Sequence, residues 1–133
     1  MADFDLHAVQ VRPTHGAAEH RRWDRLVARH HYLSFRGLFG RGLRHVATLG
    51  ETWIALLGWQ AGALKVTVRD RWIGWSNAQK LRRLHLICQN VRFLIILGQR
   101  RKNLASRVLG LSLRRLSGDM LAEHGYPVLI AEA

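Results

Sequence analysis

The chain is 133 residues long and 48% hydrophobic, and it carries 21 Lys and Arg against nine Asp and Glu. This length predicts one domain, spanning residues 1–133, that is large enough for a core of its own. The hydrophobic fraction excludes a disordered tail. The longest apolar runs, Trp53–Trp59 and Phe93–Leu97, are too short to cross a bilayer.

The net charge of +12 is the outlying property. A surface of this sign attracts and steers polyanions, so we expect proximity to nucleic acid. Eighteen of the 21 cations are Arg, which fits either a GC-biased genome or selection for contacts with phosphate. No zinc-finger spacing, basic-zipper heptads or aromatic RNA-binding signature is present in the sequence. The predicted contact is therefore non-specific.

The first residues and the single cysteine both bear on the compartment. Asp3 and Asp5 lie where a secretory signal would be basic, so we expect no signal peptide. Cys88 lies in an apolar run and has no second cysteine to pair with, which predicts a buried thiol. Both features predict a cytoplasmic protein.

In chain order, the first predicted elements are a lead-in strand over residues 1–13 and an amphipathic helix over residues 14–31. The helical spacing of Trp23, Leu26, Val27 and His30 defines the inner face of that helix. Its arginines are interpreted as solvated: Arg21, Arg22, Arg25 and Arg29.

A glycine-rich loop over residues 30–45 and a hairpin follow. His30 and His31 are adjacent and have no further ligand at metal spacing, so no metal site is predicted. Residues 45–49 and 52–59 are rich in strand formers and are joined by a turn around Gly50, which predicts the hairpin.

The second half predicts two helices and two strands. Residues 61–68 are a strand end or a short helix, and Ser76 with Asn77 caps a helix over 78–83. Residues 84–97 predict the most buried, central strand, irregular near Gln89 and Asn90. A long helix over residues 103–124, with Asn103 as its N-cap, presents an expected core face of Leu109, Leu113, Leu116 and Met120.

The last predicted elements are a helix stop and a short strand. Gly125 and Pro127 end the long helix, and residues 128–131 form a strand, so the class is α/β or α+β around one sheet. A strand this close to the end is either an edge strand or a sign of truncation. We favour truncation.

The loop between the long strand and the long helix is the first candidate site. Arg100, Arg101, Lys102 and Asn103 lie before Ala105 and Ser106 at a helix N-terminus, where free N–H groups and the helix dipole attract anions. This loop could bind a phosphate, a pyrophosphate or a nucleic-acid backbone; a plain solvated loop is an equal alternative.

Two polar groups near the sheet are further candidates. Arg69 and Asp70 are able to form an ion pair, or Asp70 could act as a base. Asn90 and Arg92 lie in an apolar run, where a buried arginine needs a partner, so we expect Arg92 to meet Asp70, Glu132 or a bound anion. Catalytic residues are not assigned: Ser106 and Ser112 lack a nucleophile elbow.

Trp72 and Trp75 flank Gly74 in the same region. They are able to stack on a base or a ring, but large aromatic side chains more often belong to the core.

The pattern Arg100-x-x-Asn103-x-Ala105 is similar to the loop by which GCN5-related N-acetyltransferases hold the pyrophosphate of acetyl-CoA. Asn103 replaces a glycine of that motif, and Asn is the non-glycine residue best suited to a left-handed backbone. The order of strand, loop, long helix, Gly and strand also resembles that fold. The resemblance implies a mostly antiparallel sheet with helices over about 16–30 and 103–124.

Several longer segments together resemble one family: HHYLSFRGLFGRGLRH, IALLGW, RDRWIGWS, NVRFLI, NLASRVLGLSLRRLSGDM and GYPVLIAE. It is the DruA-like family, a domain of unknown function whose members occur in the Druantia anti-phage defence system and beside transposases of bacterial insertion elements. The resemblance covers nearly all of the chain from about His30 onward.

The chain departs from that family in two places. Members usually have a Pro-containing loop where this chain has residues 98–102, and they continue beyond Glu132 into a Thr-Phe-Val-Asp segment and further sheet. The chain therefore resembles a fragment. No catalytic residues are established for the family.

Three hypotheses follow. The first is a basic accessory protein of a mobile element or defence locus, acting on or near nucleic acid, with transposase or defence proteins as partners and no cofactor. The second is an acyl-CoA-dependent transferase with acetyl-CoA held by residues 100–105. The third is a non-functional remnant.

Overall fold

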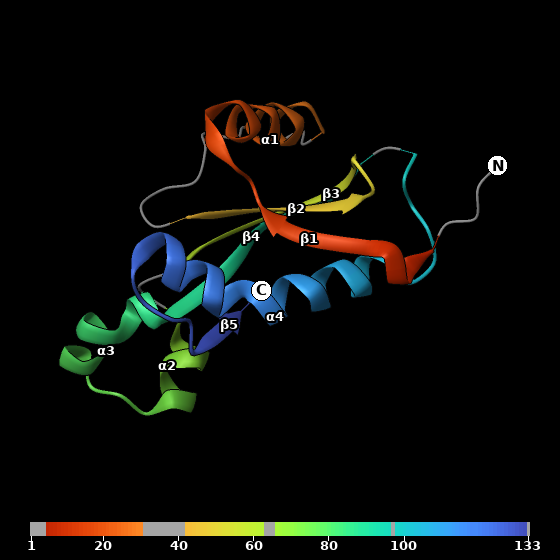
Figure 1. The fold of residues 1–133 in the computed structure, drawn as a ribbon. Helices are drawn as coiled ribbons and strands as arrows, with labels where there is room; N and C mark the ends of the chain where they lie inside the picture. The colour runs from red at the N-terminus through yellow and green to blue at the C-terminus, as the bar shows by residue number, and fades with distance from the viewer. Residues whose placement is uncertain (1–4, 31–41, 63–65, 97, 133) are drawn as a thin grey trace.

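The computed structural model describes residues 5–30, 42–62, 66–96 and 98–132. Over these residues the fold is mixed α+β, with one curled five-stranded sheet and helices on both of its faces (Figure 1). The strands are β1 Val9–Pro13, β2 Leu43–Leu49, β3 Thr52–Ala61, β4 Ile87–Ile95 and β5 Ile130–Glu132. The α-helices are α1 Gly16–His30, α2 Thr67–Ile73, α3 Asn77–Arg83 and α4 Leu104–His124.

The strands follow chain order across the sheet, β1-β2-β3-β4-β5. The first four are antiparallel and β5 pairs with β4 in parallel, at the edge of the sheet that the described strands form. The predicted hairpin is confirmed: Leu49 pairs with Thr52, and Gly50 adopts φ 62°, the left-handed backbone that tight hairpin turns require. The mixed class around a single sheet is confirmed as well.

The predicted irregularity in the long strand is a bulge. The register between β3 and β4 shifts where Gly58 faces Arg92 and Trp59 faces Asn90. The Asn90 amide donates to the carbonyls of Gly58 and Arg92, at 3.1 and 3.0 Å, and so satisfies the backbone at this point. Asn90 therefore has a structural role. The most buried strand is β3 and not β4: every residue from Trp53 to Trp59 is buried, whereas most of β4 is half-buried.

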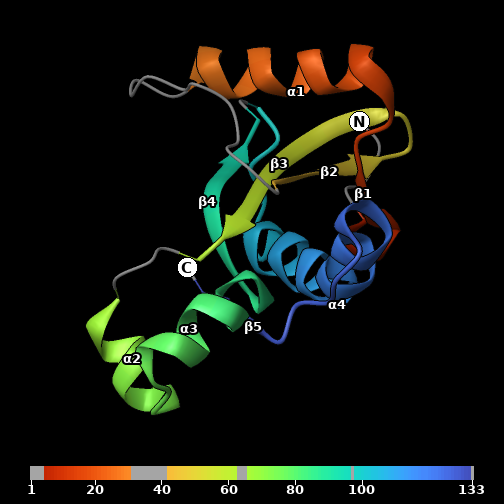
Figure 2. The ribbon, with the colours of Figure 1, turned by 90° about the vertical axis from the view of Figure 1, so that its left-hand side faces the viewer.

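Two helices cover opposite faces of the sheet (Figure 2). On one face, Trp23 and Val27 of α1 pack on Val46, Trp53 and Leu56. On the other face, α4 packs against a larger cluster from β1, β2, β3 and β4. The helical face of α1 predicted from Trp23 and Val27 is confirmed, and both side chains are fully buried.

The buried stripe of α4 differs from the prediction. It repeats every four residues: Leu104, Val108, Ser112, Leu116 and Met120. Leu116 and Met120 are placed correctly and Leu109 packs at the margin of the core. The prediction that Leu113 belongs to the core is wrong, since its side chain is 43% exposed. The spacing of apolar residues did not identify the buried face of α4, because a polar residue, Ser112, occupies the centre of that face.

Several boundaries also differ from the prediction. The strand predicted over residues 84–97 begins at Ile87, because Leu84–Leu86 form a 3-10 helix. Residues 6–8 form a 3-10 helix capped by the Asp5 side chain, so the first strand begins only at Val9. β2 begins at Leu43 inside the expected loop, whose residues 31–41 lie outside the described residues. β5 spans Ile130–Glu132, two residues later than its predicted start. Residues 61–68, predicted as a strand end or a short helix, contain both the last residue of β3 and the first residues of α2, which spans Thr67–Ile73.

Candidate functional site

A polar network lies at the centre of the molecule, beneath α4. His45 on β2 has no exposed surface; its Nδ1 lies 2.6 Å from Ser112 Oγ and its Nε2 2.8 Å from Asp119 Oδ2. Trp59 Nε1, which can only donate, also donates to Ser112 Oγ at 2.9 Å. Because the Asp119 carboxylate can only accept, His45 Nε2 carries a proton and donates to it; in a neutral ring Nδ1 then accepts from the Ser112 hydroxyl.

This order of Ser, His and Asp is that of a hydrolase triad, but its setting is structural. Ser112 and His45 both have a relative exposure of 0%, so no substrate reaches the hydroxyl. Burial lowers the pKa of His45 below its ordinary 6.5, although the bond to Asp119 opposes that shift. A neutral His45 therefore holds α4 to the sheet. Sequence patterns do not predict this network, because its members are far apart in the chain.

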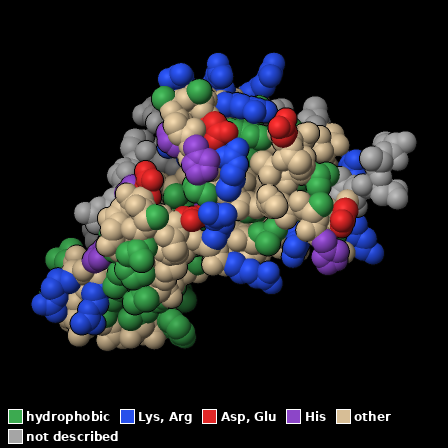
Figure 3. All heavy atoms as spheres, in the orientation of Figure 1, with side chains coloured by type: hydrophobic (Ala, Val, Ile, Leu, Met, Phe, Trp, Pro, Cys, Tyr) green, Lys and Arg blue, Asp and Glu red, His purple; other side chains and the backbone are tan. Residues whose placement is uncertain are grey.

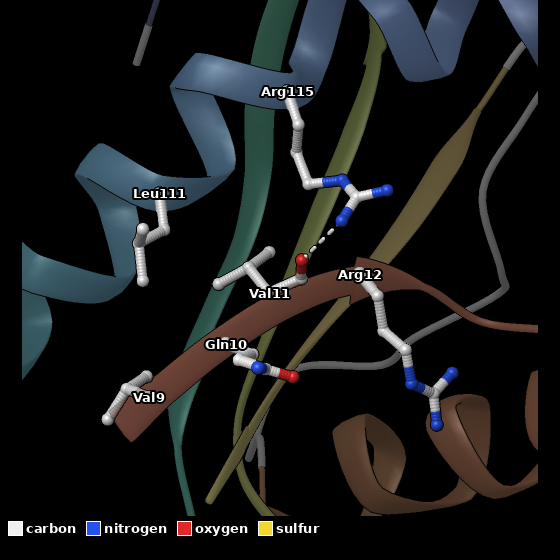
Figure 4. Close-up of a pocket in the computed structure, with 6 residues that line it drawn as sticks. All are labelled: Val9, Gln10, Val11, Arg12, Leu111 and Arg115. Carbon is white, nitrogen blue, oxygen red and sulfur yellow. Dashed lines mark hydrogen bonds between the residues drawn. The ribbon is translucent and has the colours of Figure 1, made fainter. Parts of the chain in front are cut away.

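A groove of about 310 Å³ runs between β1 and α4, lined by Val9, Gln10, Val11, Arg12, Leu111 and Arg115. Figure 4 shows Arg115 reaching from α4 to the carbonyl of Val11, at 2.6 Å. The same guanidinium pairs with Asp119, with Nε 2.6 Å from Oδ2. Arg115 therefore occupies part of the outer backbone edge of β1 and connects it to the network around His45.

A second polar network anchors α2. Arg69 is buried, at 7% exposure, and donates to Asp70 Oδ1 at 2.7 Å and to Glu132 on β5 at 3.3 and 3.4 Å. Asp70 also accepts from Trp75 Nε1 and Lys80 Nζ, at 3.1 and 3.0 Å. Although burial opposes it, these bonds lower the pKa of Asp70, so the carboxylate is a charged partner and a poor base.

The predicted ion pair of Arg69 and Asp70 is thus present, but the expected partners of Arg92 belong to Arg69 instead. Arg92 lies half-buried on β4 and donates from Nη1 to the carbonyl of Val91, at 2.8 Å. The sequence could not show whether Arg69 or Arg92 pairs with Glu132, because either side chain could have faced it. Gly62 shows how tightly the pair is packed: a Cβ there would lie 3.2 Å from Glu132 Oε1 and 3.3 Å from Arg69 Nη2.

The predicted anion loop lies at the N-terminus of α4 and is exposed at Arg100, Arg101 and Lys102. Arg101 Nη1 donates to the carbonyls of Gly98 and Arg100, at 3.4 and 2.8 Å. The loop candidates Ala105 and Ser106 are exposed on the first turn of α4.

Asn103 has φ 65°, so the predicted left-handed backbone is confirmed. Asn103 is the N-cap residue of α4, as predicted, but its side chain makes no capping hydrogen bond. In this conformation the residue turns the chain into the helix through its backbone alone.

A further cationic surface lies on α1 and was interpreted from the sequence as merely solvated. Arg22, Arg25 and Arg29, together with Leu26, line a hollow of about 500 Å³. The guanidinium carbon of Arg22 lies 4.1 Å from the centroid of the Trp53 ring, a cation–π distance. Figure 3 shows basic side chains gathered over the helix in this part of the molecule.

Two kinds of arginine therefore occur in the described parts of the chain. Arg12, Arg44, Arg69 and Arg115 pair with carboxylates. Arg21, Arg22, Arg25 and Arg29 of α1 have no salt bridge to any described carboxylate. The charge of these four arginines is thus not neutralised by a described carboxylate.

The structure does not bring the predicted site residues together. Arg69 and Asp70 lie beside Glu132, which pairs with Gln89 near the start of β4, whereas residues 98–106 follow the end of β4. At about 3.3 Å per residue, the strand separates the two groups by about 25 Å. No set of three His, Cys, Asp or Glu that could hold a metal occurs among the described residues.

Cys88, the single cysteine, is buried as predicted, at 1% exposure. Burial raises the pKa of its thiol to about 12, so the thiol is protonated and inert at neutral pH.

The fold and these networks define a small, basic α+β domain with one curled sheet and a buried histidine at its centre. A family model described as "Druantia protein DruA" matches residues 5–132. The chain belongs to this family, as its sequence motifs predicted, and the family associates it with the Druantia anti-phage defence system. Searches among curated proteins and among solved structures each gave no match.

No described helix has both the length and the apolar character needed to cross a membrane.

Proposed function

We propose that the chain binds nucleic acid non-specifically through the arginine face of α1, as an accessory protein of an anti-phage defence locus or a mobile element. The supporting observation is the hollow lined by Arg22, Arg25 and Arg29, whose charges have no described carboxylate partner. Guanidinium groups bind phosphate oxygens in a bidentate manner, and a row of them along a helix follows a phosphate backbone. Arg100 and Lys102, at the start of α4, supply further phosphate contacts in this proposal.

The fold gives this face a rigid support. Trp23 and Val27 on the inner side of α1 are fully buried, so the helix is fixed and its outer arginines keep their spacing. Arg22 is held further by its contact with the Trp53 ring. Fixed cations lose less conformational entropy on binding than mobile ones.

The test measures the anisotropy of a labelled short DNA duplex and a labelled single strand as salt is raised. We expect a steep loss of affinity between about 50 and about 200 mM salt. Replacing Arg25 and Arg29 by Ala removes two contacts and should make the salt slope shallower by about 1.8, at roughly 0.9 per phosphate. Arg114→Ala, an exposed arginine on α4 across the sheet, is the matched control and should change the slope little.

Two results contradict the proposal. Failure of both DNA forms to bind at low salt removes nucleic-acid binding altogether. If Arg114→Ala weakens binding as much as the replacement of Arg25 and Arg29 does, the attraction is diffuse and α1 is not the site. A third set of variants, Arg100→Ala and Lys102→Ala, measures the separate contribution of the loop.

One observation favours a second function, transfer of an acyl group from acyl-CoA on a GCN5-related fold. Asn103 adopts φ 65° at the N-terminus of the 21-residue α4, where the acetyltransferase motif has a glycine. The loop follows β4, and α4 leads to a strand parallel to β4. A CoA pyrophosphate would then accept backbone N–H bonds at the start of the helix.

Thermal unfolding with acetyl-CoA or CoA tests this function separately. A ligand at 100 times its Kd stabilises the folded state by about 2.7 kcal/mol, which raises Tm by several degrees. Asn103→Ala should abolish the shift, whereas Arg25→Ala should leave it intact. No change in Tm at millimolar CoA contradicts the transferase hypothesis and leaves the α1 proposal untouched.

A further inference from the structure

The helix α2 has its polar and apolar faces reversed. Its buried residue is a charged one, Arg69, at 7% exposure. Its solvent face carries Val68 and Trp72, which are 81% and 79% exposed and lie four positions apart on one side of the helix. Large exposed apolar side chains at adjacent helical positions are typical of a binding surface.

This exposed face is held in place by the network on its other side. Arg69 joins α2 to Glu132 on β5, and Asp70 joins it to Trp75 and Lys80 of the following segment. The turn between α2 and α3 is fixed by Gly74, at φ 75°, and by the capping box of Ser76. The Trp72 indole therefore extends from a helix anchored at several points.

Exposed cations lie on α2 next to Trp72 in the chain and on the neighbouring helix α3. Arg71 adjoins Trp72 on α2, and Arg82 and Arg83 lie exposed on α3. None of the three forms a salt bridge with a described residue, since Asp70 is occupied by Arg69 and Lys80. In Figure 3, hydrophobic and basic side chains lie side by side at the end of the molecule that α2 and α3 form.

We propose that this surface, formed by Val68, Arg71, Trp72, Arg82 and Arg83, binds an unpaired segment of nucleic acid, with a base stacked on Trp72 and phosphates on the arginines. Proteins that bind single strands without reading their sequence combine exposed aromatic side chains, on which bases stack, with cations that bind the phosphates. The arginines favour this occupant, because their positive charge is not neutralised by a described carboxylate and complements the negative charge of phosphate. The inference rests on the proposed function and adds that the nucleic acid bound at this surface is single-stranded.

The surface is separate from the arginine face of α1. The two helices lie at different ends of the molecule in both ribbon views (Figures 1 and 2). A nucleic acid that reaches both would place duplex backbone on α1 and an unpaired stretch on α2. The two contacts can therefore be removed independently.

The test uses the chain's own tryptophans and an oligothymidylate strand, with oligouridylate as a second probe. Trp23, Trp53 and Trp59 are at most 5% exposed and Trp75 is half-buried, so Trp72, at 79% exposure, is the indole best placed to report stacking. We expect strand addition to quench tryptophan fluorescence, and Trp72→Ala to remove most of the quenching and weaken strand binding about tenfold. Trp72→Phe should restore most of the affinity, whereas Leu121→Ser, at an exposed apolar position of α4, should change neither readout.

The outcomes separate this inference from the function on which it rests. If Trp72→Ala binds both duplex and strand as the parent does, the Trp72 surface is overturned and the α1 proposal stands. The Trp72 surface is likewise overturned if the parent protein binds the duplex and does not bind the single strand. If the parent self-associates and Trp72→Ala abolishes that association without affecting strand binding, the surface is a protein interface and the inference is overturned. If neither nucleic acid binds, both proposals fail.

Discussion

The helices α1 and α2 are both basic, yet they contact the sheet in opposite ways. α1 buries Trp23 and Val27 and exposes its arginines, as an amphipathic helix of a soluble protein is expected to do. α2 buries Arg69 and exposes Trp72. Residue type alone therefore does not determine which face of a helix is buried. In α2 the positions of two carboxylates, Asp70 and Glu132, determine it.

The largest effect is expected where α1 meets the sheet. Trp23→Ala removes a fully buried indole that also donates to the His45 carbonyl at 3.0 Å. We expect it to lower the free energy of unfolding by about 3–5 kcal/mol, measured by urea denaturation. Arg25→Ala, on the outer face of the same helix, is the control and should change it by less than about 0.5 kcal/mol. A cost below about 1 kcal/mol for Trp23→Ala would show that α1 is not anchored by this residue.

The next effect concerns the polar anchor of α2. Arg69→Leu leaves Glu132 without its partner and takes from Asp70 one of its three donors, so we expect a loss of about 3 kcal/mol in the same measurement. Arg71→Leu, exposed on the same helix, is the matched control and should be nearly neutral.

The double variant Arg69→Leu with Glu132→Leu should recover part of that loss, because it removes the unpaired carboxylate together with the arginine. No recovery would mean that Arg69 acts through packing and not through its charge.

A pH dependence is expected at the centre of the sheet and not at α2. Because the pKa of His45 in the folded state is below its ordinary 6.5, the unfolded chain binds a proton first as the pH falls. Stability contributed by neutral His45 is therefore present above about pH 6.5 and declines below it, by at most about 1.4 kcal/mol per pH unit. Asp119 and Arg115 are the charged groups facing His45. Although burial opposes it, the hydrogen bonds from His45 and Arg115 lower the pKa of Asp119, so this carboxylate stays charged in the same window.

Urea midpoints at about pH 7 and about pH 5 measure this dependence, and His45→Gln provides the comparison. That variant should be less stable at neutral pH, because it disrupts the bonds to Ser112 and Asp119, but it should lose less stability on acidification. An identical loss in both proteins would assign the dependence to other groups.

The smallest effect is expected at Trp72. Because its side chain is 79% exposed, Trp72→Ala should change the free energy of unfolding by less than about 0.5 kcal/mol. Together with Trp23→Ala it forms a matched pair of tryptophan deletions on the two helices. A cost above about 2 kcal/mol would show that Trp72 belongs to a core after all, and would remove the physical basis for a binding surface there.

The sequence predicted elements better than contacts. The hairpin around Gly50, the inner face of α1 and the end of α4 at Gly125 each follow from local spacing or backbone chemistry, and each is confirmed. The placement of Leu113 in the core was wrong. It relied on the spacing of apolar residues, whereas the buried stripe of α4 has the polar residue Ser112 at its centre. That serine is buried only because His45 and Trp59 supply its hydrogen bonds.

The candidate sites show the same limit. The left-handed Asn103 and the pairing of Arg69 with Asp70 are local properties, and the sequence predicted both. The partner of Glu132 and the hollow between the arginines of α1 depend on which elements become neighbours, and the sequence did not predict either of them.

The sequence by itself determined the family, the mixed α+β class, the excess of positive charge and the positions of the main turns, because motifs, composition and backbone preferences are properties of short segments. Only the tertiary structure decided which arginines are neutralised by carboxylates, which histidine is buried and which tryptophan is exposed. The physical reason is that burial and ion pairing depend on distances across the sheet. Residues as far apart as Arg69 and Glu132 acquire their roles only when the strands and helices meet.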